Sequence, residues 1–239
     1  MISEKTFQQI TLKYQTSEAT VLREYFQNLF LSYFYQHKDS EKIYFKGGTA
    51  LRLIYHSPRF SEDLDFSAAL SDVAPIERAV LDTLHAVSKE GVKIDLKEAT
   101  PTSGGYLAEL HFTAYNRMIS IRFEASLREG KKVGTFATVV NDFVPDYTIL
   151  QLEERQLIGE KVTALLSRKK PRDFYDFYFL LRHNLLPEKN REMFEAVMKT
   201  LHGTKINFDS ELKTFLPKSH HMIVKDFKAM LERELKRYI

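Results

Sequence analysis

Three consecutive segments of alternating apolar and polar residues constrain the fold of this chain most. They begin at Gly91, Tyr106 and Met118 and read GVKIDLKEAT, YLAELHFTAY and MISIRFEASLRE. Strict alternation places successive side chains on opposite faces of an extended chain, so each segment predicts a β-strand with one buried face. Gly104 and Gly105 separate the first two segments, which favours a tight turn and antiparallel pairing.

Helical spacing dominates on both sides of these strands. After Asn141–Pro145 the apolar residues recur at helical intervals to the C-terminus, over 152–167, 172–183, 188–200, 208–215 and 219–237. On the N-terminal side we predict strands and helices in mixed order. They are a helix over 18–37 capped by Ser17, strands over Ile43–Phe45 and Leu64–Phe66, and helices over Thr49–Tyr55 and 75–89.

These patterns predict an α+β fold over residues 1–148, with an N-terminal helix, followed by an all-helical domain over residues 149–239. The chain has 239 residues and 44% hydrophobic residues, enough for two small domains with a packed core. It has no cysteine, which excludes disulfides and thiolate metal ligands. With no long apolar run and no N-terminal signal pattern, we expect a cytoplasmic protein without a membrane segment.

Charge is distributed unevenly between the two parts. Residues 1–150 hold 17 Lys/Arg and 19 Asp/Glu, whereas residues 151–239 hold 18 and 13. The basic C-terminal part suits a polyanionic partner, although a solvated helical surface would explain so small an excess equally well.

The stretch FKGGTALRLIYHSPRFSEDLDFS, residues 45–67, carries the strongest chemical signal. Gly47 and Gly48 allow a close main-chain approach to a ligand, and the helix predicted after them offers free N–H groups that suit phosphate. Asp63 and Asp65, two residues apart on a strand, point to one face and suit a hard cation such as Mg²⁺. Either feature alone is typical of an ordinary turn or an exposed strand. Together they predict the apparatus of phosphoryl or nucleotidyl transfer.

The string KGGTAL…RFSEDLDF resembles the AbiEii/AbiGii-type nucleotidyltransferase toxins, a branch of the polymerase β-like nucleotidyltransferase superfamily. A second stretch, LEERQLIGEKVTALLSRKKPRDFYDFYFLL over residues 152–181, resembles the same branch. The matching residues there are Lys161, Arg172, Asp173, Tyr175 and Asp176. The resemblance spans roughly residues 40–183. It implies a mixed or antiparallel sheet with flanking helices, followed by helices that complete an active-site cleft.

The resemblance also implies roles for particular residues. Asp63 and Asp65 would bind Mg²⁺ or Mn²⁺ with a third carboxylate, for which Glu124 is preferred and Asp95 is the alternative. The phosphate-binding residues would be Gly47, Gly48, Thr49, Ser61 and Lys161, and Lys161 and Asp173 would also be catalytic. Asp173 and Asp176 share a helix face, so one of them would orient Lys161 or act on the acceptor. Their structural alternative is an ion-pair lattice with Arg172. We expect Arg59 to be a surface charge.

The function implied by the resemblance is transfer of a nucleoside monophosphate from an NTP to an acceptor. The acceptor implied for some relatives is RNA at a tRNA 3′ end, and a protein hydroxyl is a second candidate. The resemblance also implies, as a candidate partner, a cognate antitoxin encoded by a neighbouring gene. The alternative function is a non-catalytic module that binds a nucleotide or a partner, but the intact Asp63-Leu64-Asp65 argues against a degenerate site.

Overall fold

The computed structural model describes residues 1–127 and 130–239, and within them the chain divides into two compact units. The first comprises Met1–His56 and Phe60–Glu153, and the second comprises Ser57–Arg59 and Glu154–Ile239. A short segment that interrupts the first unit therefore belongs to the second. The main boundary lies after Glu153, whereas the sequence predicts it after residue 148.

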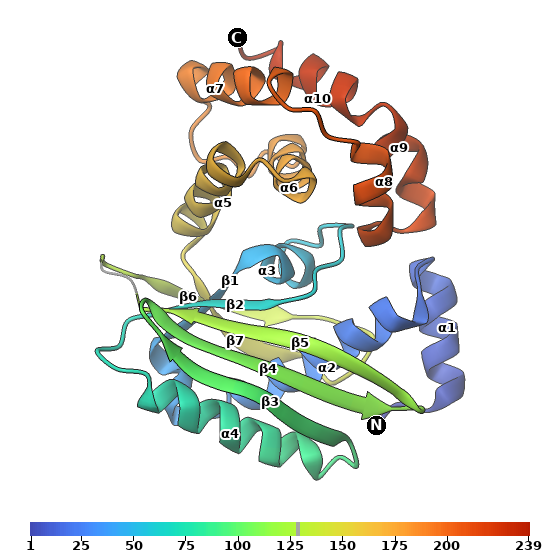
Figure 1. The fold of residues 1–239 in the computed structure, drawn as a ribbon, viewed down its shortest axis with the longest axis vertical. Coiled ribbons are helices and arrows are strands. Elements are labelled where there is room, and N and C mark those ends of the chain that lie inside the picture. The colour runs from blue at the N-terminus through green and yellow to red at the C-terminus, as the bar shows by residue number, and fades with distance from the viewer. Residues whose placement is uncertain (128–129) are drawn as a thin grey trace. The chain divides into compact units, whose positions relative to one another are not determined.

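Within the described residues, the first unit holds one seven-stranded sheet with the order β3-β4-β5-β2-β1-β7-β6 (Figure 1). β2 and β5 are parallel, as are β1 and β7, and the other neighbours are antiparallel. The three alternating segments form β3, β4 and β5, as predicted. The strands are β1 (Ile43–Lys46), β2 (Leu64–Ala68), β3 (Lys93–Thr102), β4 (Gly105–Ala114), β5 (Arg117–Ser126), β6 (Gly134–Val139) and β7 (Tyr147–Leu152).

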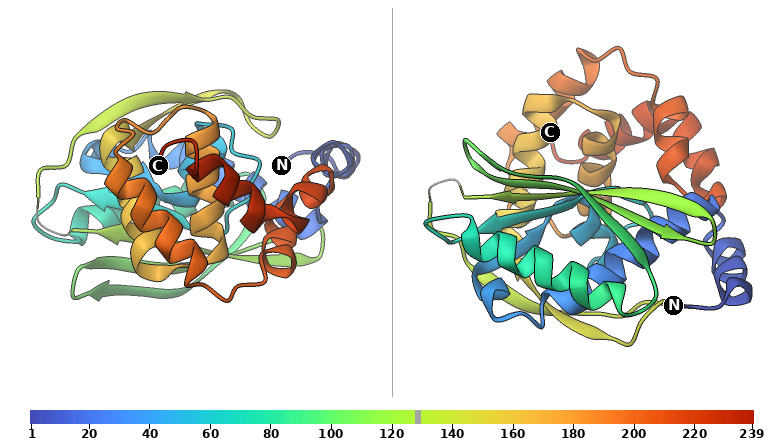
Figure 2. Two further views of the ribbon diagram at one scale, coloured as in Figure 1. Left: turned by 90° about the horizontal axis from the view of Figure 1, so that it is seen from above. Right: turned by 60° about the horizontal axis from the view of Figure 1, so that its bottom comes forward.

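Helices cover both faces of this sheet. α2 and α4 pack against one face, and the short α3 lies on the opposite face (Figures 1 and 2). Ser17 caps α2 as predicted, because its hydroxyl accepts a hydrogen bond from the Thr20 N–H. The helical elements are α1 (Glu4–Tyr14), α2 (Glu18–Phe34), the 3₁₀ helix η1 (Lys38–Lys42), α3 (Gly47–Leu53) and α4 (Ala74–Ser88).

The core beneath α2 is aromatic. Phe26 of α2 stacks on Phe112 of β4 with ring centroids 4.9 Å apart, and Phe66 of β2 stacks on Phe123 of β5 at 4.6 Å. All four rings are fully buried, and each burial contributes about 2 kcal/mol to stability. This packing fixes β2, which carries the Asp63–Asp65 stretch, at the centre of the sheet.

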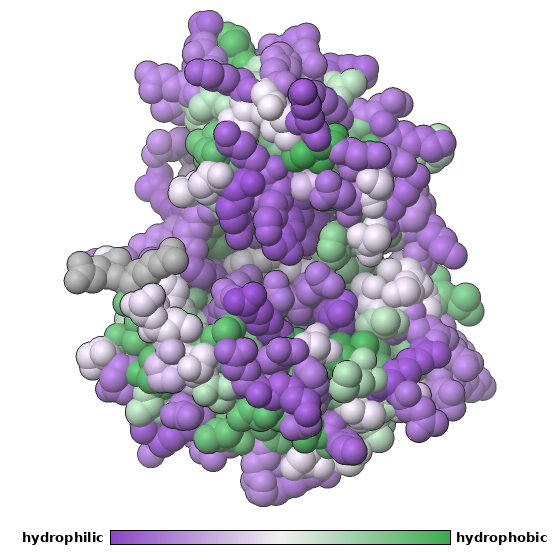
Figure 3. All heavy atoms as spheres, viewed as in Figure 1, coloured by the Kyte–Doolittle hydropathy of each residue, from purple (hydrophilic) through white to green (hydrophobic). Residues whose placement is uncertain are grey.

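The second unit is helical, and phenylalanines at its centre hold it together. Phe174 and Phe227 both contact Phe208, with ring centroids 5.4 and 5.2 Å from it. Its surface is mainly hydrophilic on the side seen in Figure 3. No helix of the described chain is long and apolar enough to cross a membrane. The helices are α5 (Glu154–Arg168), α6 (Pro171–Arg182), α7 (Arg191–His202), α8 (Phe208–Leu212), α9 (His221–Lys225) and α10 (Phe227–Leu235), with 3₁₀ helices η2 (Lys213–Phe215) and η3 (Lys218–His220).

Two strands, β6 and β7, are missing from the sequence prediction. The last four residues of β7, Ile149–Leu152, are all buried, so this strand lacks the alternation that marks a half-exposed one. β6 lies at the sheet edge and buries only Val139 completely, so it has no apolar period either. The predicted helix over 219–237 is divided at Asp226 into α9 and α10.

Candidate active site

The glycine turn at the end of β1 lies directly against the carboxylate of Asp65. Gly47 has φ +85°, and a Cβ atom built on it would lie 2.1 Å from Asp65 Oδ2. Only glycine combines this left-handed backbone with so close an approach. The pairing of Lys46 with Asp65 in the sheet register brings the two segments together. Gly47 and Asp65, which the sequence predicts to belong to one site, are therefore close together in the fold.

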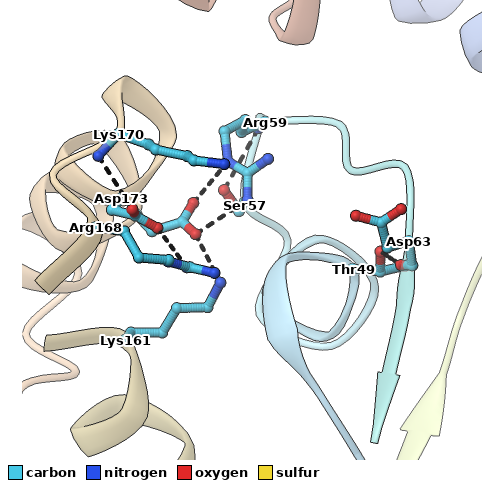
Figure 4. Close-up of polar contacts among 9 residues, drawn as sticks. Thr49, Ser57, Arg59, Asp63, Lys161, Arg168, Lys170 and Asp173 are labelled. Carbon is cyan, nitrogen blue, oxygen red and sulfur yellow. Dashed lines mark hydrogen bonds and ion pairs between the residues drawn. The ribbon is translucent and has the colours of Figure 1, made fainter. Parts of the chain in front are cut away.

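The main chain at Asp63 is held by hydrogen bonds. Thr49 is completely buried in α3, and its Oγ1 donates to the Asp63 carbonyl oxygen at 2.5 Å (Figure 4). Just before it, Gln27 Nε2 of α2 donates to the carbonyl oxygens of Ser61 and Glu62, both at 3.1 Å. The Thr49 hydroxyl proton is thus used to position Asp63, and the sequence gives no signal for the part played by Gln27.

Asp63 and Asp65 are both half-buried, and a third carboxylate lies next to them. Glu124 of β5 is the parallel register partner of Asp65, on the adjacent strand. Its side chain is 45% exposed and forms an ion pair with Arg122 at 2.6 Å. Asp95 lies on the edge strand β3, which β4 and β5 separate from β2, and it pairs with Lys97. Of the two predicted candidates, Glu124 is therefore the one beside Asp65.

The donor set at this end of the sheet suits Mg²⁺. In the described part of the chain, no three His, Asp or Glu side chains form a group that would hold a metal by themselves. Mg²⁺ does not need such a group, because it is usually held by one or two carboxylates together with substrate phosphates and water. Asp63 and Asp65, which share a face of an extended segment, supply those two carboxylates.

A buried ion cluster in the second unit contains Lys161. Asp176 of α6 accepts from Lys161 Nζ at 2.8 Å and from Arg59 Nε and Nη2 at 2.7 and 3.0 Å (Figure 4). Arg59 and Asp176 are 3% and 1% exposed, and Lys161 is 11% exposed. The prediction that Arg59 is a surface charge is wrong, because the segment Ser57–Arg59 belongs to this unit and its guanidinium finds a carboxylate there.

The charges in this cluster stabilise one another. Burial by itself raises the pKa of the Asp176 carboxyl, but the neighbouring charges of Arg59 and Lys161 and their hydrogen bonds bring it below its usual range. Burial lowers the pKa of the Arg59 guanidinium, and the charge of Asp176 more than reverses this, so the net shift is upward. Asp176 and Arg59 are therefore both charged at neutral pH.

Asp173, the other acid predicted to act with Lys161, has different partners. Its carboxylate accepts from Arg168 Nη2 at 2.7 Å and from the Lys170 N–H at 3.2 Å (Figure 4). It is fully buried at the N-terminus of α6, where an acid also complements the helix dipole. The acid that contacts Lys161 is Asp176, which the sequence left open as one of two candidates.

The chain is similar to known nucleotidyltransferase toxins. The model of the family described as nucleotidyl transferase AbiEii toxin, type IV toxin–antitoxin system, matches residues 29–237. MenT4, a nucleotidyltransferase toxin from Mycobacterium tuberculosis H37Rv, superimposes with a TM-score of 0.66 and 14% identity, covering 100% of this chain and 93% of its own. JHP933 from Helicobacter pylori gives 0.59 and 18%, covering 93% and 95%. At such identities the likeness shows the fold alone. No curated protein compared with the chain matches it.

Proposed function

Since this chain belongs to the AbiEii family of nucleotidyltransferase toxins, we propose that it transfers a nucleoside monophosphate from an NTP to an RNA, with Mg²⁺ or Mn²⁺ bound at Asp63 and Asp65. Membership makes the chain an enzyme of the nucleotidyltransferase class and implies an NTP substrate and a cognate antitoxin. The metal, the RNA acceptor and the residue roles are the proposed part.

One observation carries the proposal, namely that the glycine turn and the Asp-x-Asp strand are built onto each other. Gly47 leaves no room for a side chain against Asp65, and the buried Thr49 hydroxyl holds the Asp63 carbonyl. A turn that served only to connect β1 and α3 would need neither contact. The arrangement instead fixes two carboxylates beside main-chain N–H groups, as a metal-bound triphosphate requires.

Each residue then has a task in the reaction. The N–H groups of Gly47, Gly48 and Thr49 would bind the β- and γ-phosphates, with the Ser61 hydroxyl as a further donor. Lys161 would act on the same nucleotide as a point charge on the triphosphate. Glu124 would support the metal ligands. Asp173, with its cap and its Arg168 partner, would hold the start of α6 in place.

Magnesium bound at the two aspartates would neutralise phosphate charge and lower the pKa of the attacking hydroxyl. The oxygen of that hydroxyl would form the new bond to the α-phosphorus and lose its proton to water, and the bond to the leaving pyrophosphate would break. Asp63 and Asp65 would keep the attacking and leaving groups in line, because Thr49 holds the Asp63 carbonyl and the Gly47 main chain lies against the Asp65 side chain.

RNA is the acceptor we favour because of the charge of the helical part. Residues 151–239 hold 18 Lys/Arg against 13 Asp/Glu, which suits a phosphate backbone. A tRNA 3′ end combines such a phosphate backbone with a vicinal hydroxyl pair in a single strand, so it is a suitable acceptor. A protein hydroxyl is the competing acceptor, and the experiment below separates them.

The test is to incubate the chain with Mg²⁺, each α-³²P-labelled NTP in turn, and total RNA, and then to separate RNA from protein. We expect label in RNA, with loss of label when Mg²⁺ is chelated or when Asp63→Ala is used. Label in a protein band alone would move the proposal to a protein acceptor. NTP binding without pyrophosphate release, on any RNA or protein, would favour the alternative of a non-catalytic module.

A further inference from the structure

The cluster of Arg59, Lys161 and Asp176 carries more positive than negative charge. Two cations contact one buried carboxylate, so these three groups sum to one surplus positive charge. The neighbouring Asp173 pairs with a cation of its own, Arg168, and its charge also acts on Arg59. An excess of positive charge among largely buried groups suits an anion from outside the protein.

The geometry assigns the surplus charge to Lys161. Arg59 contacts Asp176 through two nitrogens and both carboxylate oxygens, at 2.7 and 3.0 Å, the paired arrangement that best matches guanidinium to carboxylate. Lys161 shares only Oδ2, at 2.8 Å, and a lysine ammonium has three N–H donors. Lys161 is also the most exposed of the three, at 11%.

We infer that Arg59 is a positioning residue for nucleotidyl transfer. Arg59 neutralises and orients Asp176, and Asp176 then directs the Lys161 ammonium toward the triphosphate without cancelling the positive charge of the lysine. Without Arg59, Lys161 and Asp176 would form a neutral ion pair, and this pair would attract an anion only weakly. This inference rests on the proposed role of Lys161. Arg59 precedes Asp63 by only four residues, so one short segment carries both Arg59 and the first aspartate.

The test measures anion binding separately from turnover, since the acceptor is still to be identified. Inorganic triphosphate, without metal, is titrated by calorimetry into the full-length chain and into Arg59→Met, Lys161→Met and the double variant. We expect each single variant to bind about tenfold more weakly, as for the loss of one charge-assisted contact. The double variant should bind more weakly than either single variant, because it leaves the buried Asp176 carboxylate without either of its cations.

Two conservative variants distinguish positioning from general support of the fold. Arg59→Lys keeps the charge and loses the paired contact, so it should restore triphosphate affinity to within about threefold of wild type. With the NTP and RNA that wild type uses, it should keep KM and lower kcat. Asp176→Asn removes the negative charge, so it should retain or raise triphosphate affinity while kcat falls. Arg191→Met, which breaks only an exposed helical ion pair with Glu195, is the matched control and should change neither value.

The possible outcomes separate this inference from the proposed function. Normal triphosphate binding by Arg59→Met overturns the inference, whatever the RNA assay shows. Normal binding by Lys161→Met overturns the proposed role of Lys161 and the inference together. If neither Arg59 variant folds, Asp176→Asn tests the inference instead. A loss of triphosphate affinity in that variant contradicts the inferred excess of positive charge. Retained affinity with reduced kcat supports the inference.

Discussion

Each unit of this chain contains a pair of nearby aspartates, and the two pairs differ in their burial. Asp63 and Asp65 are half-buried. The Thr49 hydroxyl holds the Asp63 carbonyl oxygen, and the Gly47 main chain lies against the Asp65 side chain. Asp173 and Asp176 are fully buried and each meets protein cations within hydrogen-bonding distance. The first pair is suited to a cation that arrives with a substrate. The second is already neutralised, so it suits the placement of cations and of a helix end.

The largest expected effect tests the first pair. Asp63→Ala or Asp65→Ala should lower nucleotidyl transfer about a thousandfold or more, because each removes a metal ligand worth several kcal/mol to the transition state. The melting temperature should stay the same or rise, since carboxylate repulsion is relieved. Label transfer and a thermal melt measure the two effects. Either variant with full activity would remove the metal site from the mechanism.

If the chain is toxic when expressed without its antitoxin, these two variants should be harmless at equal protein levels. Growth after induction measures this, with Asp82→Asn as a control at a well-exposed aspartate. Toxicity that persists in an inactive variant would separate toxicity from transfer.

The second prediction concerns Asp176 and the pH dependence of stability. Its pKa is lowered in the folded state, so its contribution is present in full above the unfolded value of about 3.9 and is lost as the pH falls through the folded value. Asp176→Asn should lower the free energy of unfolding by about 3 kcal/mol at pH 7. The gap to wild type should shrink below about pH 4.

Urea unfolding of wild type, Asp176→Asn and the exposed control Asp82→Asn, at pH 7 and at steps below pH 4, measures this. A gap that stays constant with pH would mean that Asp176 contributes by packing rather than by charge. The charge of the Asp173/Asp176 pair would then not be what distinguishes it from the Asp63/Asp65 pair.

Sequence patterns predicted the first pair far better than the second. Gly47, Asp63 and Asp65 lie within one short stretch, and their chemistry follows from residue type and spacing. Arg59 and Asp176 are 117 residues apart, and no local pattern shows that the segment Ser57–Arg59 packs in the helical unit. An arginine near a turn is usually exposed, so the prediction failed where a long-range ion pair overrides that tendency.

The same distinction applies to the fold. β3, β4 and β5 were predictable because each has one face in water or near it, which produces alternation. β7 is buried along most of its length, and its apolar run at Ile149–Leu152 does not reveal a strand. Thr49 was predicted to bind phosphate from its position, and that position gave no signal that its hydroxyl donates to the Asp63 carbonyl oxygen. Residue type limits what a side chain does, and packing decides which partner it takes.

A third prediction tests whether the Gly47 contact positions Asp65. Gly47→Ala places a Cβ where Asp65 Oδ2 now lies, and Gly91→Ala is the matched control, with φ +80° and nothing within 4 Å. Both should lose about 1 kcal/mol of stability from the left-handed backbone. Only Gly47→Ala should lose transfer activity, about a hundredfold for a displaced catalytic group. Equal activities in the two variants would contradict a positioning role for the turn.

The smallest expected effect concerns the third carboxylate, and it compares the two candidates in the first unit, Glu124 and Asp95. Glu124 lies beside Asp65 in register, and its ion pair with Arg122 is exposed and therefore weak, so its carboxylate is available to a bound metal. Glu124→Gln should lower transfer about tenfold, as for loss of a supporting carboxylate, and should raise the Mg²⁺ concentration needed for half-maximal rate. Asp95→Asn, on the edge strand, should change neither. A larger loss in Asp95→Asn than in Glu124→Gln would show that register with Asp65 does not select the third acid.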